Sequence, residues 1–247
     1  MADDERVETI KTSDGAPFCG ISNKDDLDGP TLAWGVPSKV EPRWPASLAI
    51  VFAMAVYIFL PGQYTVGPNW LMPALELAIL VPVSLSAPRR VHGESYLLQV
   101  LAMAMIALVT MANCAALLLL IERVVHFAEI SGAELLYSSI SIWITNVIVF
   151  SLWYWEIDRG GPDQRAHAIH RNPDFLFPQM TTPGCAAADW TPQFSDYLYV
   201  AFTNATAFSP TDSMPLTGKA KLLMAAQSII SLGTIIITSA RAVNILQ

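Results

Sequence analysis

Long apolar stretches alternate with short polar ones along the chain from residue 45 onward. Most reach the ~20 residues that a helix needs to cross ~30 Å of hydrocarbon. The apolar windows are Pro45 to Leu60, Trp70 to Ser86, Tyr96 to Ile121, Leu135 to Trp155 and Leu222 to Leu246. Strand-like alternation is absent, and lipid offers no water to open backbone groups, so we expect helices in every window.

The composition also indicates a helical membrane protein. Apolar residues make up 53% of the chain and charged residues only 14%. We therefore predict an all-α integral membrane protein with about five transmembrane helices and one re-entrant helix before the last span. The first window is short, so it is either a tilted span or one half of a re-entrant hairpin with the second.

The segment before the first window has a different character. Residues 1–44 carry nine acids against five bases, with Gly, Pro and Ser scattered among them. Such a segment has too little apolar area to offset chain entropy, so we expect a disordered acidic tail. The segment lacks a basic region followed by a short apolar run, so we expect no cleavable signal peptide. A three-helix region, 45–133, is expected to follow.

Polar residues inside apolar windows are expensive and therefore candidates for function, and we single out three of them. Glu76 is central in the second window. It is either a coupling or proton-relay carboxylate or, as we prefer, a hydrogen-bonded group that ties helices together. Asn113 and Asn146 are expected to bridge helices as packing features.

The sequence contains no motif that indicates a catalytic site. The spacing of His167 and His170, with Asp163 and Asp174 nearby, offers two imidazoles on one helix face but no third ligand at a fixed spacing. No phosphate loop, dinucleotide fingerprint, zinc-protease motif or nucleophile elbow occurs. We expect no enzyme activity, no metal site, no cofactor and no nucleic-acid partner.

The last third, 134–247, follows the order outer helix, long loop (157–193), short helix (194–207), polar turn (206–212) and long helix (218–246). The short helix contains Asp196, Thr203 and Asn204, which make it too polar to face lipid along its length. We therefore predict that it re-enters rather than crosses. A half-length helix, a polar turn and a full-length helix in that order are typical of a pore-loop channel.

The residues of this module resemble the pore domain of bacterial potassium channels. Without a gap, the chain matches the family's filter end and inner helix at Asp212, Pro215, Thr217, Lys221, Ala240 and Arg241, while Gln227 stands where many relatives carry Glu. The same register sets Tyr197 to Ala205 as the pore helix. It sets seven residues over the family's Thr-Thr-Val-Gly-Tyr-Gly-Asp filter, namely Thr206, Ala207, Phe208, Ser209, Pro210, Thr211 and Asp212.

The filter-like turn departs from that family at its glycines. Ser209 and Thr211 replace both, and a β-branched residue at positive φ is costly. Pro210 fixes its own φ near −65°. A ladder of backbone carbonyls is therefore not expected. The hydroxyls of this turn and the carboxylate of Asp212 would instead form a wider constriction.

A second resemblance covers roughly residues 140 to 247. Asp174-Phe-Leu-Phe-Pro in the loop and the run from Phe194 to Thr203 are similar to a bacterial family of uncharacterised, predicted multi-pass membrane proteins. This resemblance implies a protein of the bacterial inner membrane and brings no known activity with it.

Two indications of orientation disagree. Arg and Lys collect on the side of the N-terminus, which places that terminus in the cytoplasm. A potassium-channel pore loop, however, enters from the outer face. Either the tail is exported, or the loop is inverted, or residues 190–208 cross the membrane outright as a sixth span. The base count favours the cytoplasmic N-terminus.

Three functions remain open from the sequence. The preferred one is a homo-oligomeric, tetrameric channel in the lipid bilayer that passes monovalent cations with weak selectivity. The alternatives are a non-conducting membrane scaffold or complex subunit and a small transporter that uses Glu76. The transporter is disfavoured because no inverted repeat is visible.

Overall fold

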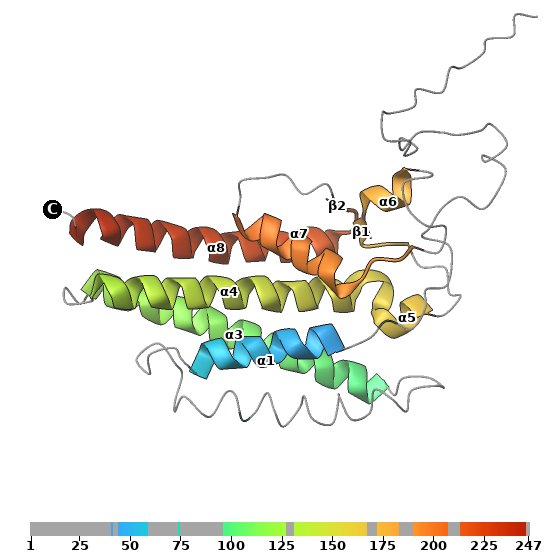
Figure 1. Cartoon of the computed structure of the whole chain (residues 1–247), viewed down its shortest axis with the longest axis horizontal. Helices are drawn as coiled ribbons and strands as arrows, with labels where there is room; N and C mark the ends of the chain where they lie inside the picture. Colours follow the sequence, from blue (N-terminus) through green and yellow to red (C-terminus); the bar gives the residue numbers. More distant parts are fainter. Residues whose placement is uncertain are drawn as a thin grey trace, which may run out of the picture.

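The computed structural model describes residues 41, 44–58, 74, 96–126, 131–166, 172–182, 190–206 and 213–245. Their principal helices are aligned along one axis, as Figure 1 shows, with α4 in the middle. The bounds are α1 (Trp44–Ile58), α3 (Tyr96–His126), α4 (Gly132–Ile157), α7 (Phe194–Thr206) and α8 (Gly218–Ile245). Glu76 and nearly all of the expected second window lie outside the described residues.

Helix α4 owes its position and length to its two ends. Ser131 precedes it and accepts a hydrogen bond from the backbone of Glu134 at 3.2 Å, as an N-capping serine does. At the other end the helix stops at its C-cap residue Asp158, whose backbone is extended (φ −61°, ψ 119°), and Gly160 and Gly161 follow with positive φ. Between these ends α4 contacts α1, α3, α7 and α8. It is therefore the helix around which the others pack.

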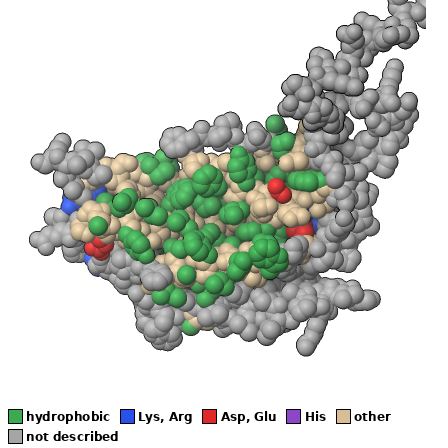
Figure 2. Space-filling view, viewed as in Figure 1, with side chains coloured by type: hydrophobic (Ala, Val, Ile, Leu, Met, Phe, Trp, Pro, Cys, Tyr) green, Lys and Arg blue, Asp and Glu red, His purple; other side chains and the backbone are tan. Residues whose placement is uncertain are grey.

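Apolar side chains cover much of one face of the bundle (Figure 2). Helices α3, α4 and α8 are long and apolar enough to cross a membrane, and α1 is a shorter apolar helix. Charged side chains lie toward the two ends of the long axis, with apolar side chains between them (Figure 2). This arrangement is what a bilayer-embedded bundle requires, because charge is costly within hydrocarbon. The predicted helical class is thus confirmed for the described residues, and three of their helices are long and apolar enough to cross a membrane, while five spans and a re-entrant helix stay a prediction.

The start of α7 and the residues that lead into α8 lie at one end of the bundle. The strands β1 (Phe175–Leu176) and β2 (Met214–Pro215) pair in antiparallel register, Phe175 with Pro215 and Leu176 with Met214. This pairing brings the chain after residue 212 back to the end at which α7 begins (Figure 1). The short elements η5 (Asp158–Gly160), α5 (Pro162–Ala166) and α6 (Pro178–Thr181) gather there too.

Two sequence expectations need correction at this end. The segment 157–193 was expected to be a loop, yet it contains η5, α5, β1 and α6. The tail was expected to be disordered to residue 44, but α1 begins at Trp44 and Glu41 is 7% exposed. Burial of Glu41 has a physical cause, which is its pairing with a buried arginine. Residues 1–40 lie outside the described ranges.

Candidate functional site

Helix α7 ends beside the middle of α4 and α8. Its last residues touch Trp143 of α4, whose indole nitrogen donates to the Ala205 carbonyl at 3.5 Å and whose ring meets Phe202 edge-on with centroids 5.8 Å apart. Thirteen residues make a helix of about 20 Å, which is short of the ~30 Å hydrocarbon thickness. The C-terminal end of α7 therefore stops part-way along the bundle.

A network of buried hydrogen bonds fixes α7 against its neighbours, with Gln227 of α8 at its centre. The Gln227 side chain is fully buried and donates from Nε2 to the Ala201 carbonyl at 2.8 Å. Its Oε1 accepts hydrogen bonds from the Tyr154 hydroxyl and from Asn204 Nδ2, the latter at 2.8 Å. One amide thus joins α4, α7 and α8.

Two further amides extend this network. Asn146 Nδ2 donates to Ser231 Oγ at 2.8 Å and to the Gln227 carbonyl at 3.2 Å, so Asn146 joins α4 to α8. Asn204 Nδ2 donates to the Met224 carbonyl at 3.0 Å, and Ser228 Oγ donates to Asn204 Oδ1 at 3.2 Å. Polar groups in an apolar belt must find such partners within the protein.

A second cluster, of charged residues, lies at the end of α4. Asp158 is completely buried and accepts hydrogen bonds from the Tyr197 hydroxyl at 2.6 Å and the Asp174 backbone at 2.7 Å. Asp174 in turn accepts from the Arg159 backbone at 3.1 Å and from Thr217 Oγ1 at 2.6 Å. These contacts hold Arg159 at φ 53°, a left-handed backbone conformation that is unfavourable for residues other than glycine. They fasten the starts of α7 and α8 to the end of α4.

Arg165 of α5 forms the second half of this cluster. It binds Glu41 through two parallel contacts, Nε to Oε1 at 2.8 Å and Nη2 to Oε2 at 3.0 Å. Its Nη1 donates to the carbonyls of Trp155 and Asp158. Burial alone would lower the pKa of the Arg165 guanidinium. Tyr197, Glu41 and Asp158 outweigh it, and its pKa stands above the ordinary value.

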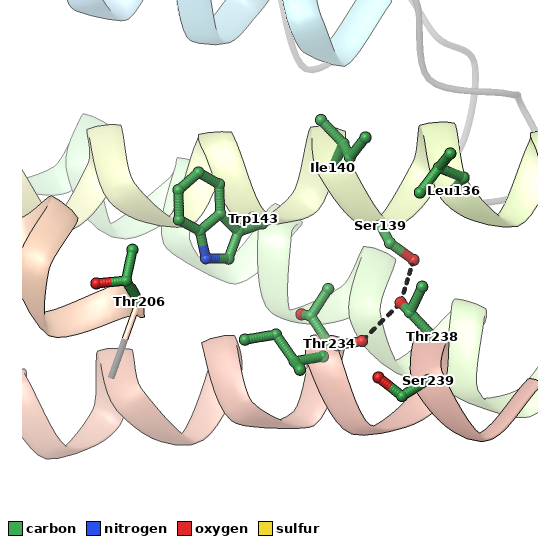
Figure 3. Close-up of a pocket in the computed structure, with 9 residues that line it drawn as sticks. Leu136, Ser139, Ile140, Trp143, Thr206, Thr234, Thr238 and Ser239 are labelled. Carbon is green, nitrogen blue, oxygen red and sulfur yellow. Dashed lines mark hydrogen bonds between the residues drawn. The ribbon is translucent and has the colours of Figure 1, made fainter. Parts of the chain in front are cut away.

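A pocket of about 300 Å³ lies where α7 ends (Figure 3). Its walls come from α4, α7 and α8, and include Trp143, Thr206 and Thr234. Three hydroxyls on the wall donate to backbone carbonyls: Thr206 to Thr203 at 2.9 Å, Thr234 to Ile230 at 2.8 Å and Thr238 to Thr234 at 2.7 Å. The surface left to the pocket is mainly apolar.

The structure places only part of the predicted site. Thr206 lies at the end of α7, while the remaining filter-like residues, 207–212, lie outside the described residues. His167 and His170 are outside them too. Asp174, named with them as a possible ligand, is engaged in hydrogen bonds at the end of α4. Within the described ranges no group of three or more His, Cys, Asp or Glu could hold a metal.

Sequence reasoning missed the residues that organise both clusters. Gln227 was noted only as a departure from a glutamate, although a lone amide within an apolar helix is a signal for an interhelical hydrogen bond. Glu41, Asp158 and Arg165 gave no such signal, because charges flanking apolar windows usually face water.

Comparison with protein-family models, curated proteins and solved structures gave no match. A function is therefore proposed from the geometry of the chain itself.

Proposed function

We propose that this chain is one subunit of a homo-oligomeric membrane pore that passes monovalent cations with little selectivity. The observation that carries the proposal is the course of the chain around α7. This helix begins at the end of the bundle held by Asp158, stops beside Trp143, and is followed by β2 back at the first end. In a bilayer a chain that enters with α7 and comes back before β2 would dip in and return on the same side.

The direction of α7 favours cations. A helix carries a partial negative charge at its C-terminal end, equivalent to roughly half an elementary charge. In α7 that end is the one that lies part-way along the bundle, where hydrocarbon screens little. The following segment adds the hydroxyls of Ser209 and Thr211 and the carboxylate of Asp212. All of these groups would attract a cation and repel an anion.

The exposure of α8 supports assembly from several copies. Only 17% of its apolar window is buried, against 72% for the window of α4. Large apolar side chains stand outward along it, including Leu222, Ile229 and Ile236. In a pore-loop assembly the helix after the loop lines the interface between subunits. The resemblance to potassium channels makes four copies the expected number.

A non-conducting scaffold is the second candidate, and one observation favours it. The polar side chains that made α7 look like a pore helix are largely used in packing. Asn204 bonds to α8, and Thr203 donates to the carbonyls of Tyr199 and Val200. The polarity of α7 therefore has a sufficient structural explanation without an ion path.

Cation flux separates the two candidates. Purified protein in liposomes is expected to pass K⁺ and Na⁺ at comparable rates. Asp212→Asn should reduce that flux most at low salt, where screening of the carboxylate ring is weakest. Asp196→Asn, at the opposite end of α7, is the matched control and should leave the salt dependence unchanged. Folded, oligomeric protein without flux under voltage, pH or osmotic challenge would favour the scaffold.

A further inference from the structure

A second, smaller cavity lies on the other side of α4, where α4 meets α1 and α3. It leaves a volume of about 10 Å³ for a water molecule, against about 300 Å³ for the pocket beside α7. Its wall is formed by Val56 and Tyr57 of α1, Asn113 and Ala116 of α3, and Ser141, Ile142 and Thr145 of α4. The cavity is thus small, polar on several sides, and inside the belt of apolar helices.

Two buried polar side chains face this cavity without a hydrogen-bond partner among the described residues. Asn113 and Thr145 are each 5% exposed, and they come from different helices. A buried amide or hydroxyl without a partner is costly in any protein interior, and within hydrocarbon bulk water cannot relieve it. Their position therefore points to a small polar ligand that both can reach.

The chemistry of the wall decides which ligand. Ser141 Oγ donates its hydrogen to the Tyr137 carbonyl at 2.9 Å, which leaves its lone pairs to accept a hydrogen bond. The Asn113 amide offers both donors and an acceptor, and the Thr145 hydroxyl offers both roles as well. Among the described residues no carboxylate lines the cavity to neutralise a cation. A neutral molecule that donates and accepts is the best match.

We propose that one water molecule binds in this cavity and joins Asn113 of α3 to Thr145 of α4. A buried water needs roughly 10–15 Å³ and two to four polar partners, and this cavity provides both. The asparagine thereby links helices, as its place in the sequence suggested, through a water rather than directly. The water is a structural ligand of the α1–α3–α4 side of the bundle and is independent of the path proposed beside α7.

A structure of the whole protein in a lipid nanodisc, at a resolution that shows ordered water, tests the site. We expect one peak within about 2.7–3.2 Å of both Asn113 and Thr145. A crystal structure of the protein with Tl⁺ in place of K⁺ should show no anomalous signal at the position of this peak. An empty cavity, or a peak with the anomalous signal of thallium, would overturn the assignment, the latter in favour of a cation site.

A double-mutant cycle provides an independent readout that does not need high resolution. Asn113→Leu and Thr145→Val each remove a partner of the shared water while nearly keeping the side-chain volume. We expect the double variant to lower the midpoint of thermal unfolding by no more than the more damaging single variant, because either change releases the water. Thr145→Val combined with Ser228→Ala, at the α7 side, should be additive. Additive shifts for the Asn113 and Thr145 pair would contradict a shared ligand.

Discussion

Gln227 is the residue whose surroundings best explain why α7 stays in place. Its side chain contacts groups from α4 and α7, and neither its donor nor its acceptor faces water. An apolar residue of similar size would fill the same volume but would leave the Tyr154 hydroxyl without its acceptor. It would also remove one hydrogen bond from the Ala201 carbonyl and one from the Asn204 amide, which keeps its bond to the Met224 carbonyl. The amide therefore specifies the position of α7 as well as stabilising it.

Replacing Gln227 with leucine should accordingly cost about 1–3 kcal/mol of stability, since buried polar groups lose their partners. The measurement is denaturation of the purified protein in mild detergent, followed by intrinsic fluorescence. Ile229→Leu introduces the same side chain on the exposed face of α8 and should change stability little. Equal behaviour of the two variants would show that the network around Gln227 carries no weight.

The pair formed by Glu41 and Arg165 is the second test at this scale. Arg165→Met should cost about 3–5 kcal/mol, because it leaves the Glu41 carboxylate buried without a counter-charge. Adding Glu41→Gln to that variant should restore part of the loss. Thermal unfolding of the two single variants and the double variant measures the coupling. Simple additivity would mean that the two groups do not depend on each other.

At the scale of elements, most helices could be predicted from the sequence, but the contacts that join distant segments at the end of the bundle could not. The windows Tyr96 to Ile121 and Leu135 to Trp155 found α3 and α4 because a long apolar run has only one stable form in lipid. The expected short helix, 194–207, which the resemblance to a pore helix suggested, agrees with α7 at Phe194–Thr206.

The pairing of β1 with β2 escaped prediction because each strand has only two residues and its partner is far along the chain. The same holds for the charged cluster around Asp158, whose members come from five separate segments. Nothing local in the sequence indicates that Asp158 would be buried at the end of α4. Local patterns predicted elements, whereas contacts between distant segments required the folded chain.

The proposed re-entrant course of α7 can be tested by cysteine labelling. In a chain whose native cysteines are replaced by serine, single cysteines at Ser195 and Lys219 should be labelled by an impermeant reagent from the same face. Both residues are exposed and lie at the end of the bundle that holds β1 and β2. A cysteine at Ala133, at the start of α4, should be labelled from the opposite face. Labelling of Ser195 and Lys219 from opposite faces would mean that the chain between them crosses outright.

At the scale of the whole molecule, the single chain leaves α8 largely uncovered. Helix α4 is surrounded by four helices, but Leu222, Ile229, Leu232 and Ile236 of α8 stand outward. Lipid can cover such a face, and so can another copy of the chain. One α7 beside one α8 does not enclose a path, so the proposed pore requires that several copies meet along this surface.

The number of chains per particle therefore tests the central claim most directly. Native mass spectrometry of the full-length protein, released from lipid nanodiscs, gives that number without any assumption about ions or gating. A closed assembly of identical chains, four by the resemblance to potassium channels, is the predicted result. Ile229→Lys, which sets a charge on the outward face of α8, should break it into smaller particles. A particle that remains a single chain under mild conditions would contradict a shared pore.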